Sequence, residues 1–206
     1  MFFYEKVYVF GGVKMKRIIS TALLTIVLLA SVSWIVLSNF DFRRYEDLQE
    51  AIEKGIPYEI NSVIHTERFD DVTIVMYTTN PDKEELPFAD YEALAVAFFE
   101  GNDNVGWENI GSNDWTHYEN ENMTVYSHPL RKYDNKGNIL HEIYVVYGEI
   151  NNPNIVTVET KAGEEKTFKE AQMITKKGNL YYFKIGRDTI VRGVSERGEV
   201  IDQQGG

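Results

Sequence analysis

One stretch constrains this chain more than any other: an uncharged, mostly apolar run from Ile18 to Phe40, IISTALLTIVLLASVSWIVLSNF. Its 23 residues are long enough, as a helix, to cross the apolar core of a bilayer, which is roughly 30 Å thick. We therefore predict a transmembrane helix over residues 18–40, and we treat the chain after Phe40 as a separate domain.

The charges that flank this run predict its orientation. Lys14, Lys16 and Arg17 stand directly before it, whereas acidic and basic residues are mixed after Phe40. Lys and Arg resist translocation, so residues 1–17 are expected in the cytoplasm and residues 41–206 outside the cell membrane. The predicted protein is thus a single-pass signal-anchor protein that contacts the bilayer through Ile18–Phe40.

A cleaved secretory signal is the alternative interpretation of the same stretch. Met15, Lys16 and Arg17 form a positive start, and the small residues Ser31 to Ser33 provide a cleavage site before Trp34. The apolar run continues past that site, which favours the anchor. Met15 also resembles a natural translation start, so we expect the native chain to begin there rather than at Met1.

The composition excludes some classes of partner and some sources of fold stability. After Phe40 the chain has 17 basic and 31 acidic residues, a net charge of −14, which predicts repulsion from nucleic acid. The chain has no Cys, which excludes disulfides and an acylated-Cys anchor, so packing must supply the stability. The length of the exterior part suits one domain with a real core.

Hydrophobic periodicity predicts a short helix followed by strands. Asp41–Lys54 has a helical spacing of apolar residues that Gly55 and Pro57 end, giving a juxtamembrane helix and linker over 41–57. From Tyr58 the period becomes two, and Asp70-Asp71 predicts a hairpin turn before a central strand over Val72–Thr78.

Further strands are expected with turn residues between them. Tyr91–Glu100 fits a helix or a strand, and the turn-rich segment from Gly101 to Gly106 favours a strand in a second hairpin. Residues 111–137 are polar and irregular. The other strand candidates are Met123–Tyr126, Ile139–Ile150, Ile155–Thr160, Phe168–Ile174, Leu180–Ile185, Thr189–Ser195 and Val200–Ile201.

These elements predict a mostly β fold, an antiparallel sandwich or meander with some α+β character, behind the transmembrane helix. The extracytoplasmic β-rich domain spans residues 58–202, and residues 203–206 are expected to form a frayed tail.

Catalytic motifs are absent from the sequence. No Cys nucleophile, G-x-S-x-G elbow, H-E-x-x-H pair, Walker loop or dinucleotide fingerprint occurs, so we predict a protein that is not an enzyme and needs no cofactor. Asn102, Asp103 and Asn104, between Glu100 and Glu108, offer calcium ligands, but such clusters are also typical of tight turns. We expect turn chemistry there and no metal site.

A cluster of aromatic residues between positions 107 and 133 gives the one candidate ligand site in the sequence. The site residues that we single out are Trp107, Trp115, His117, Tyr118 and Tyr126, with His128 and Tyr133 nearby. Aromatic side chains in a polar region can line a site for a sugar or a peptide, although they also serve as core residues of irregular strands.

Several segments together carry a resemblance. The chain resembles small secreted or membrane-anchored proteins of spore-forming Gram-positive bacteria at Ile56–Ile60, Val63–Glu67, Val72–Tyr77, Ala95–Glu100, Gly106-Trp107, Val145–Ile150, Ile155–Glu159 and Val191–Ile201. To our knowledge that group has no characterised function. The resemblance implies a bacterial, extracytoplasmic, β-rich protein, and it implies no functional residue.

The function predicted from the sequence is a membrane-anchored binding module of the bacterial envelope, with an envelope protein or peptide as its partner. The alternative is a carbohydrate-binding domain or hydrolase directed at the cell wall.

Overall fold

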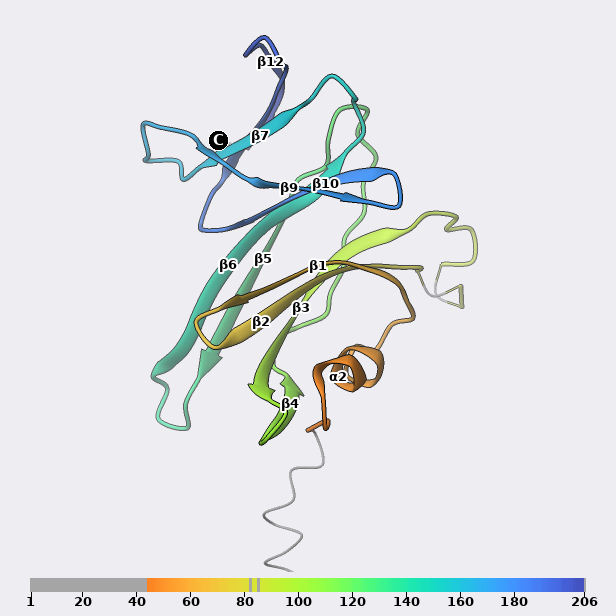
Figure 1. The fold of residues 1–206 in the computed structure, drawn as a ribbon, viewed down its shortest axis with the longest axis vertical. Coiled ribbons are helices and arrows are strands. Elements are labelled where there is room, and N and C mark those ends of the chain that lie inside the picture. Colours follow the sequence, from red (N-terminus) through yellow and green to blue (C-terminus); the bar gives the residue numbers. More distant parts are fainter. Residues whose placement is uncertain (1–43, 82, 85, 206) are drawn as a thin grey trace, which may run out of the picture. The chain divides into compact units, whose positions relative to one another are not determined.

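The computed structural model describes residues 44–81, 83–84 and 86–205, which lie in one compact unit spanning Arg43–Gly206 (Figure 1). The cytoplasmic segment 1–17 and the transmembrane helix predicted over Ile18–Phe40 fall outside these residues. Within the described ranges, no helix has both the length and the apolar character needed to span a bilayer.

The helix α2, Leu48–Gly55, begins later than the sequence predicts. Asp47 caps it by accepting a hydrogen bond from the backbone N–H of Glu50 at 2.8 Å. Tyr45 lies outside the helix, because its backbone N–H and C=O both bond to Trp107 at 2.8 Å. The prediction of a helix starting at Asp41 is therefore wrong for residues 44–47, since strand-like pairing and a cap at Asp47 compete with helix formation.

The first sheet is an antiparallel meander in which each strand pairs with the next along the chain. Asp70 and Asp71 adopt φ values of 48° and 63°, the left-handed conformation that a two-residue hairpin turn requires. The predicted hairpin and the central, fully buried position of its second strand are confirmed, as is a strand within Tyr91–Glu100. Its strands are β1 Ile60–Phe69, β2 Val72–Thr79, β3 Ala93–Asn102 and β4 Gly106–Asn109.

Two more four-stranded antiparallel sheets follow, with strand orders β5-β6-β10-β9 and β12-β11-β7-β8. The second sheet contains β5 Tyr126–Tyr133, β6 Ile139–Ile150, β9 Gln172–Lys176 and β10 Asn179–Ile185. The third contains β7 Thr157–Lys161, β8 Lys169–Glu170, β11 Ile190–Val194 and β12 Val200–Gln204. The predicted single run Phe168–Ile174 is thus divided between two sheets.

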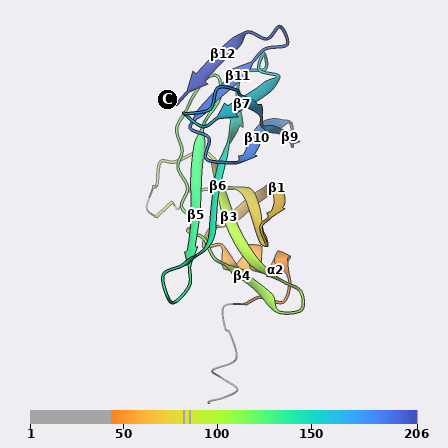
Figure 2. The same ribbon diagram turned by 90° about the vertical axis from the view of Figure 1, so that its left-hand side faces the viewer.

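The sheets and the helix are arranged in layers (Figures 1 and 2), and three apolar clusters hold these layers together. The largest lies between the first and second sheets, where Phe98 of β3 packs in the same core as Tyr147 of β6. The second lies between α2 and the outer face of the first sheet, and the third joins the second and third sheets. The prediction of a mostly antiparallel β domain is confirmed.

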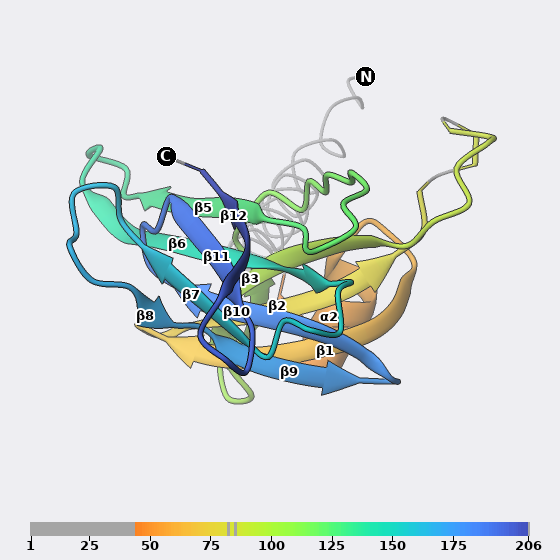
Figure 3. The same cartoon turned by 90° about the horizontal axis from the view of Figure 1, so that it is seen from above.

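The two sheets that form the main core also approach one another along one edge. Their edge strands β1 and β9 lie next to each other there (Figure 3). The third sheet packs against the second sheet through the third apolar cluster.

The strand β5 is a feature that the sequence analysis missed, because it predicted an irregular segment over 111–137 with a strand at Met123–Tyr126. In the structure Met123 makes an isolated bridge to Ile150, and the strand begins at Tyr126. Pro129 lies within it, which an edge strand tolerates because Pro cannot donate to a ladder.

The C-terminal segment is also ordered further than predicted. Gln203 and Gln204 belong to β12 instead of a frayed tail. The amide of Gln204 donates to the carbonyl oxygen of Met123 at 2.7 Å and thereby ties the end of the chain to the segment before β5.

Candidate functional site

An open groove lies beside the irregular segment that precedes β5. Its volume is ≈ 550 Å³, within the range of ligand pockets in proteins. The groove is lined by Tyr91, His117, Tyr118, Glu119, Asn120, Glu121, Thr124, Glu149 and Asn151. These residues come from three separate parts of the chain, which the fold brings together.

Stacked rings form one wall of the groove. The rings of Tyr91 and His117 lie 3.8 Å apart between centroids and only 10° from parallel. Trp115 supports Tyr91 from the side, edge-on, at 6.3 Å. The Nε2 atom of His117 is buried and has no hydrogen-bond partner among the residues that the structure describes. The wall is therefore flat, aromatic and fixed by its own packing.

Contacts at both the hydroxyl and the ring of Tyr118 fix the position of this side chain. Its hydroxyl accepts a hydrogen bond from the Val125 N–H and donates to Oε1 of Gln204 at 2.9 Å. Its ring lies edge-on to the buried Tyr126 at 5.5 Å, and partial burial raises the pKa of Tyr118. The ring keeps part of its surface exposed, so it presents a rigid face to the groove.

The groove is acidic. Glu119 and Glu121 are exposed at its rim, and Glu149 is half-buried within it. Burial raises the pKa of Glu149, and the nearby Glu92 raises it further. A cation in the groove would relieve this repulsion, because opposite charge favours an ionised carboxylate.

Backbone contacts fix the groove segment against β6. The Thr124 N–H donates to the Glu149 carbonyl oxygen at 2.9 Å, and the Glu149 N–H donates to Oγ1 of Thr124 at 2.9 Å. Asn151 also donates through its amide to the Asn120 carbonyl oxygen at 2.7 Å. These bonds hold the lining residues in place without a ligand.

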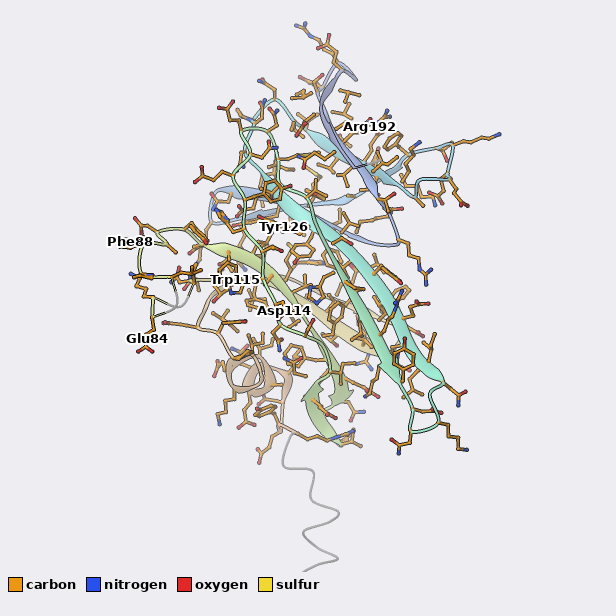
Figure 4. All side chains as sticks on the ribbon, turned by 180° about the vertical axis from the view of Figure 1, so that it is seen from behind. Glu84, Phe88, Asp114, Trp115, Tyr126 and Arg192 are labelled. Atoms are coloured by element: carbon orange, nitrogen blue, oxygen red, sulfur yellow. The ribbon has the colours of Figure 1, made fainter. Side chains whose placement is uncertain are left out.

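The structure places the five site residues of the sequence analysis in different surroundings. His117 and Tyr118 line the groove, and Trp115 lies behind Tyr91. Trp107 is buried beside α2, where its indole N–H donates to Oδ1 of Asp103 at 2.7 Å. Tyr126 is buried in the main core, whereas Trp115 packs against the second cluster, between α2 and the first sheet; both residues are labelled in Figure 4.

His128 and Tyr133 do not join the groove either. His128 is buried near Phe98 and bonds through Nε2 to Oγ of Ser112 at 3.0 Å, and its burial lowers its pKa. Tyr133 is half-exposed at the far end of β5. Of the aromatic residues that the sequence analysis grouped together, only some therefore lie at the groove.

The Asn-Asp-Asn cluster makes a turn. Oδ1 of Asn102 accepts from the Asn104 N–H at 2.9 Å, while Asp103 accepts from Trp107. Among the described residues, no group of three or more His, Asp or Glu side chains is placed to hold a metal ion.

The sequence did not indicate the other seven lining residues, which are Tyr91, Glu119, Asn120, Glu121, Thr124, Glu149 and Asn151. Tyr91 stacks on a residue 26 positions away, and no local pattern predicts such a contact. Comparison of the chain with protein-family models, with curated proteins and with solved structures found no match.

Proposed function

We propose that this protein is a single-pass, membrane-anchored binding module of the bacterial envelope, and that its groove binds a basic peptide segment of an envelope protein. The proposed arrangement is a β-sandwich domain held outside the cell by the transmembrane helix over residues 18–40. Two sequence features support it: the apolar run with its basic N-terminal flank, and the resemblance to extracytoplasmic proteins of Gram-positive bacteria.

The observation that carries the choice of ligand is the combination of charge and aromatic surface in one preformed groove. Glu119, Glu121 and Glu149 supply carboxylates for Lys or Arg side chains. The stacked Tyr91 and His117 supply a flat face for the apolar stem of such a side chain or for a guanidinium plane. Because the lining is already ordered, little conformational entropy is lost on binding.

Titration with basic peptides tests this proposal. We expect saturable binding of a Lys/Arg-rich decapeptide that weakens with salt, and no binding of the matched Glu-rich peptide. Glu119→Gln with Glu121→Gln should weaken binding about tenfold, since two exposed ion pairs contribute up to ~1 kcal/mol each. The matched control, Glu164→Gln with Glu196→Gln, removes two exposed carboxylates elsewhere and should bind as the wild type does. Equal affinity of both double variants would contradict the proposed site.

A wall-directed carbohydrate-binding domain or hydrolase is the second candidate, and the stacked aromatic wall with the amides of Asn120 and Asn151 favours it. Neutral wall fragments discriminate between the two candidates. A saturable change in Trp fluorescence that persists at high salt, and that Trp115→Ala abolishes, would favour carbohydrate over peptide.

A further inference from the structure

We propose that the end of the domain at which Arg44 lies is a membrane-contacting surface that rests on lipid headgroups. This inference depends on the membrane anchor of the proposed function. The surface consists of four apolar side chains at two hairpin tips: Val105 between β3 and β4, and Tyr133, Ile139 and Leu140 beside the β5–β6 turn. We call these four residues the hairpin-tip surface.

Arg44 is fixed to the first of these hairpins. Its guanidinium donates from Nη1 to the Val105 carbonyl oxygen at 3.2 Å and lies 3.9 Å from the carboxylate of Glu108. Tyr45 then pairs through its backbone with Trp107 of β4. The chain therefore enters the domain directly beside the β3–β4 tip.

The β5–β6 hairpin reaches the same end of the domain. Its turn, the β3–β4 turn and the beginning of α2 lie at a similar height in two perpendicular views (Figures 1 and 2). Side chains connect the two hairpins: Lys132 of β5 bonds to Glu100 of β3, and His141 of β6 lies 4.0 Å from the same carboxylate. These contacts hold the β5–β6 hairpin against the β3–β4 hairpin, and Arg44 is bonded to the second of these.

The apolar side chains at these tips are open to solvent. Val105 is 57 %, Tyr133 52 %, Ile139 54 % and Leu140 51 % exposed. The turn that carries three of them is rigid, because Asp134 accepts hydrogen bonds from the N–H groups of Lys136 and Asn138 at 2.8 Å. Rigid, exposed apolar side chains at one end of a domain indicate contact with an apolar or interfacial partner.

The length of the chain identifies that partner. Only Asp41, Phe42 and Arg43 separate Phe40, the last residue of the apolar run, from Arg44. Fully extended, this connection spans at most about 14 Å, because each residue adds no more than about 3.6 Å. If residues 18–40 cross the bilayer, the surface around Arg44 must therefore face the headgroups.

Charge at this end of the domain is mixed: the β3–β4 hairpin carries the acidic residues Asp103 and Glu108, with Arg44 beside Glu108. Although the chain after Phe40 is strongly acidic, the β5–β6 hairpin carries the basic residues Arg131, Lys132 and Lys136 against Asp134 and Glu142. Tyr and aliphatic side chains next to Lys and Arg are typical of segments that lie at a membrane interface.

The absence of Cys allows a direct test with single labels on the full chain. Val105→Cys and Leu140→Cys are each labelled with an environment-sensitive fluorophore and reconstituted into phosphatidylcholine vesicles that contain doxyl-labelled lipid. Val200→Cys is the matched control, a Val that is 49 % exposed at the start of β12, in the sheet that lies away from both hairpin tips (Figure 1). A thermal melt of each labelled variant checks that the domain is folded.

We expect the labels at positions 105 and 140 to shift to the blue and to lose most of their emission to the doxyl lipid, while the label at 200 keeps its emission. Vesicle flotation is measured on the same samples. If the protein floats and the labels at 105 and 140 are not quenched, the membrane-contacting surface is wrong and the anchor stands. Failure to float would overturn the anchor and the surface together. A blue shift without quenching would indicate a second copy of the chain at this end, and would also overturn the proposal.

Discussion

At the scale of single residues, the groove contains one carboxyl, that of Glu149, whose ionised form is disfavoured by its surroundings in the fold. Glu149 follows the buried Gly148 in β6, and its half-buried carboxyl has a raised pKa because of burial and the charge of Glu92. A residue that costs stability and lines a concave acidic surface fits a role in binding better than a role in folding.

Glu149→Gln should therefore stabilise the domain at pH 7. A carboxyl whose pKa is higher in the folded state binds more protons there, so its contribution to stability falls as the pH rises from about 4.5, the ordinary pKa of a Glu side chain, through the raised pKa of the folded state. The advantage of the variant should vanish below pH 4.5, where the wild-type carboxyl is protonated in both states. Denaturant titrations at several pH values measure the difference in the free energy of unfolding between the variant and the wild type, with Glu196→Gln as the exposed control. A variant that is less stable than the wild type at pH 7 would contradict this explanation.

Individual contacts at the site were beyond sequence reasoning for a physical reason. The residue types were informative, since His117 and Tyr118 were chosen as aromatic residues in a polar region and both line the groove. The stacking of Tyr91 on His117 and the approach of Glu149 depend on which strands become neighbours, and periodicity carries no information on that choice. Trp107 and Tyr126 are buried in the core instead, because aromatic side chains bury a large apolar surface.

At the scale of elements, turn chemistry made the first sheet predictable. Asp70-Asp71 and the segment Gly101–Gly106 each connect two strands that pair directly, so local residues determine the pairing. The strand β5 was not predictable in the same way, because Pro129 and the polar residues between its buried side chains resemble a loop. Its partner β6 supplies the ladder that makes it a strand.

The segment that leads into β5 passes so close to β6 that only Gly fits at position 148. A Cβ there would lie 1.9 Å from the Thr124 carbonyl oxygen and 2.8 Å from Cε1 of Tyr182. The same carbonyl accepts a hydrogen bond from the Tyr182 hydroxyl at 2.8 Å, so the segment cannot move away without breaking it.

We therefore expect Gly148→Ala to destabilise the domain by roughly 1–3 kcal/mol, the usual cost of overpacking a core. For a domain of this size each kcal/mol lowers the melting temperature by about 2–4 °C. Gly163→Ala is the matched control, because the nearest atom to its added Cβ lies 3.6 Å away. Equal melting temperatures of the two variants would show that the segment before β5 is not held against β6.

At the scale of the described domain, residues 44–205 form three sheets and one helix within one compact unit, and the two surfaces that we propose to be functional differ in chemistry. The groove is acidic and aromatic, whereas the hairpin-tip surface is apolar with both basic and acidic neighbours. Val105 of the hairpin-tip surface lies beside Arg44, which follows the predicted anchor in the chain, and the groove lies beside the segment that precedes β5. The proposed module would be oriented by the membrane through one of these surfaces and would bind its partner through the other.

The mostly antiparallel β class followed from the short strands and the turn residues between them. The way in which three sheets share two interfaces could not be predicted, since it depends on long-range packing between segments such as β1 and β9.

The location of a C-terminal tag on the full chain tests both the membrane anchor and its orientation. Cells are fractionated, and protease is added outside intact spheroplasts. We expect the tag to sediment with membranes and to be removed by external protease without lysis. A tag that survives until the membrane is broken would contradict the orientation, and a tag found in the medium on a chain beginning at Trp34 would contradict the anchor.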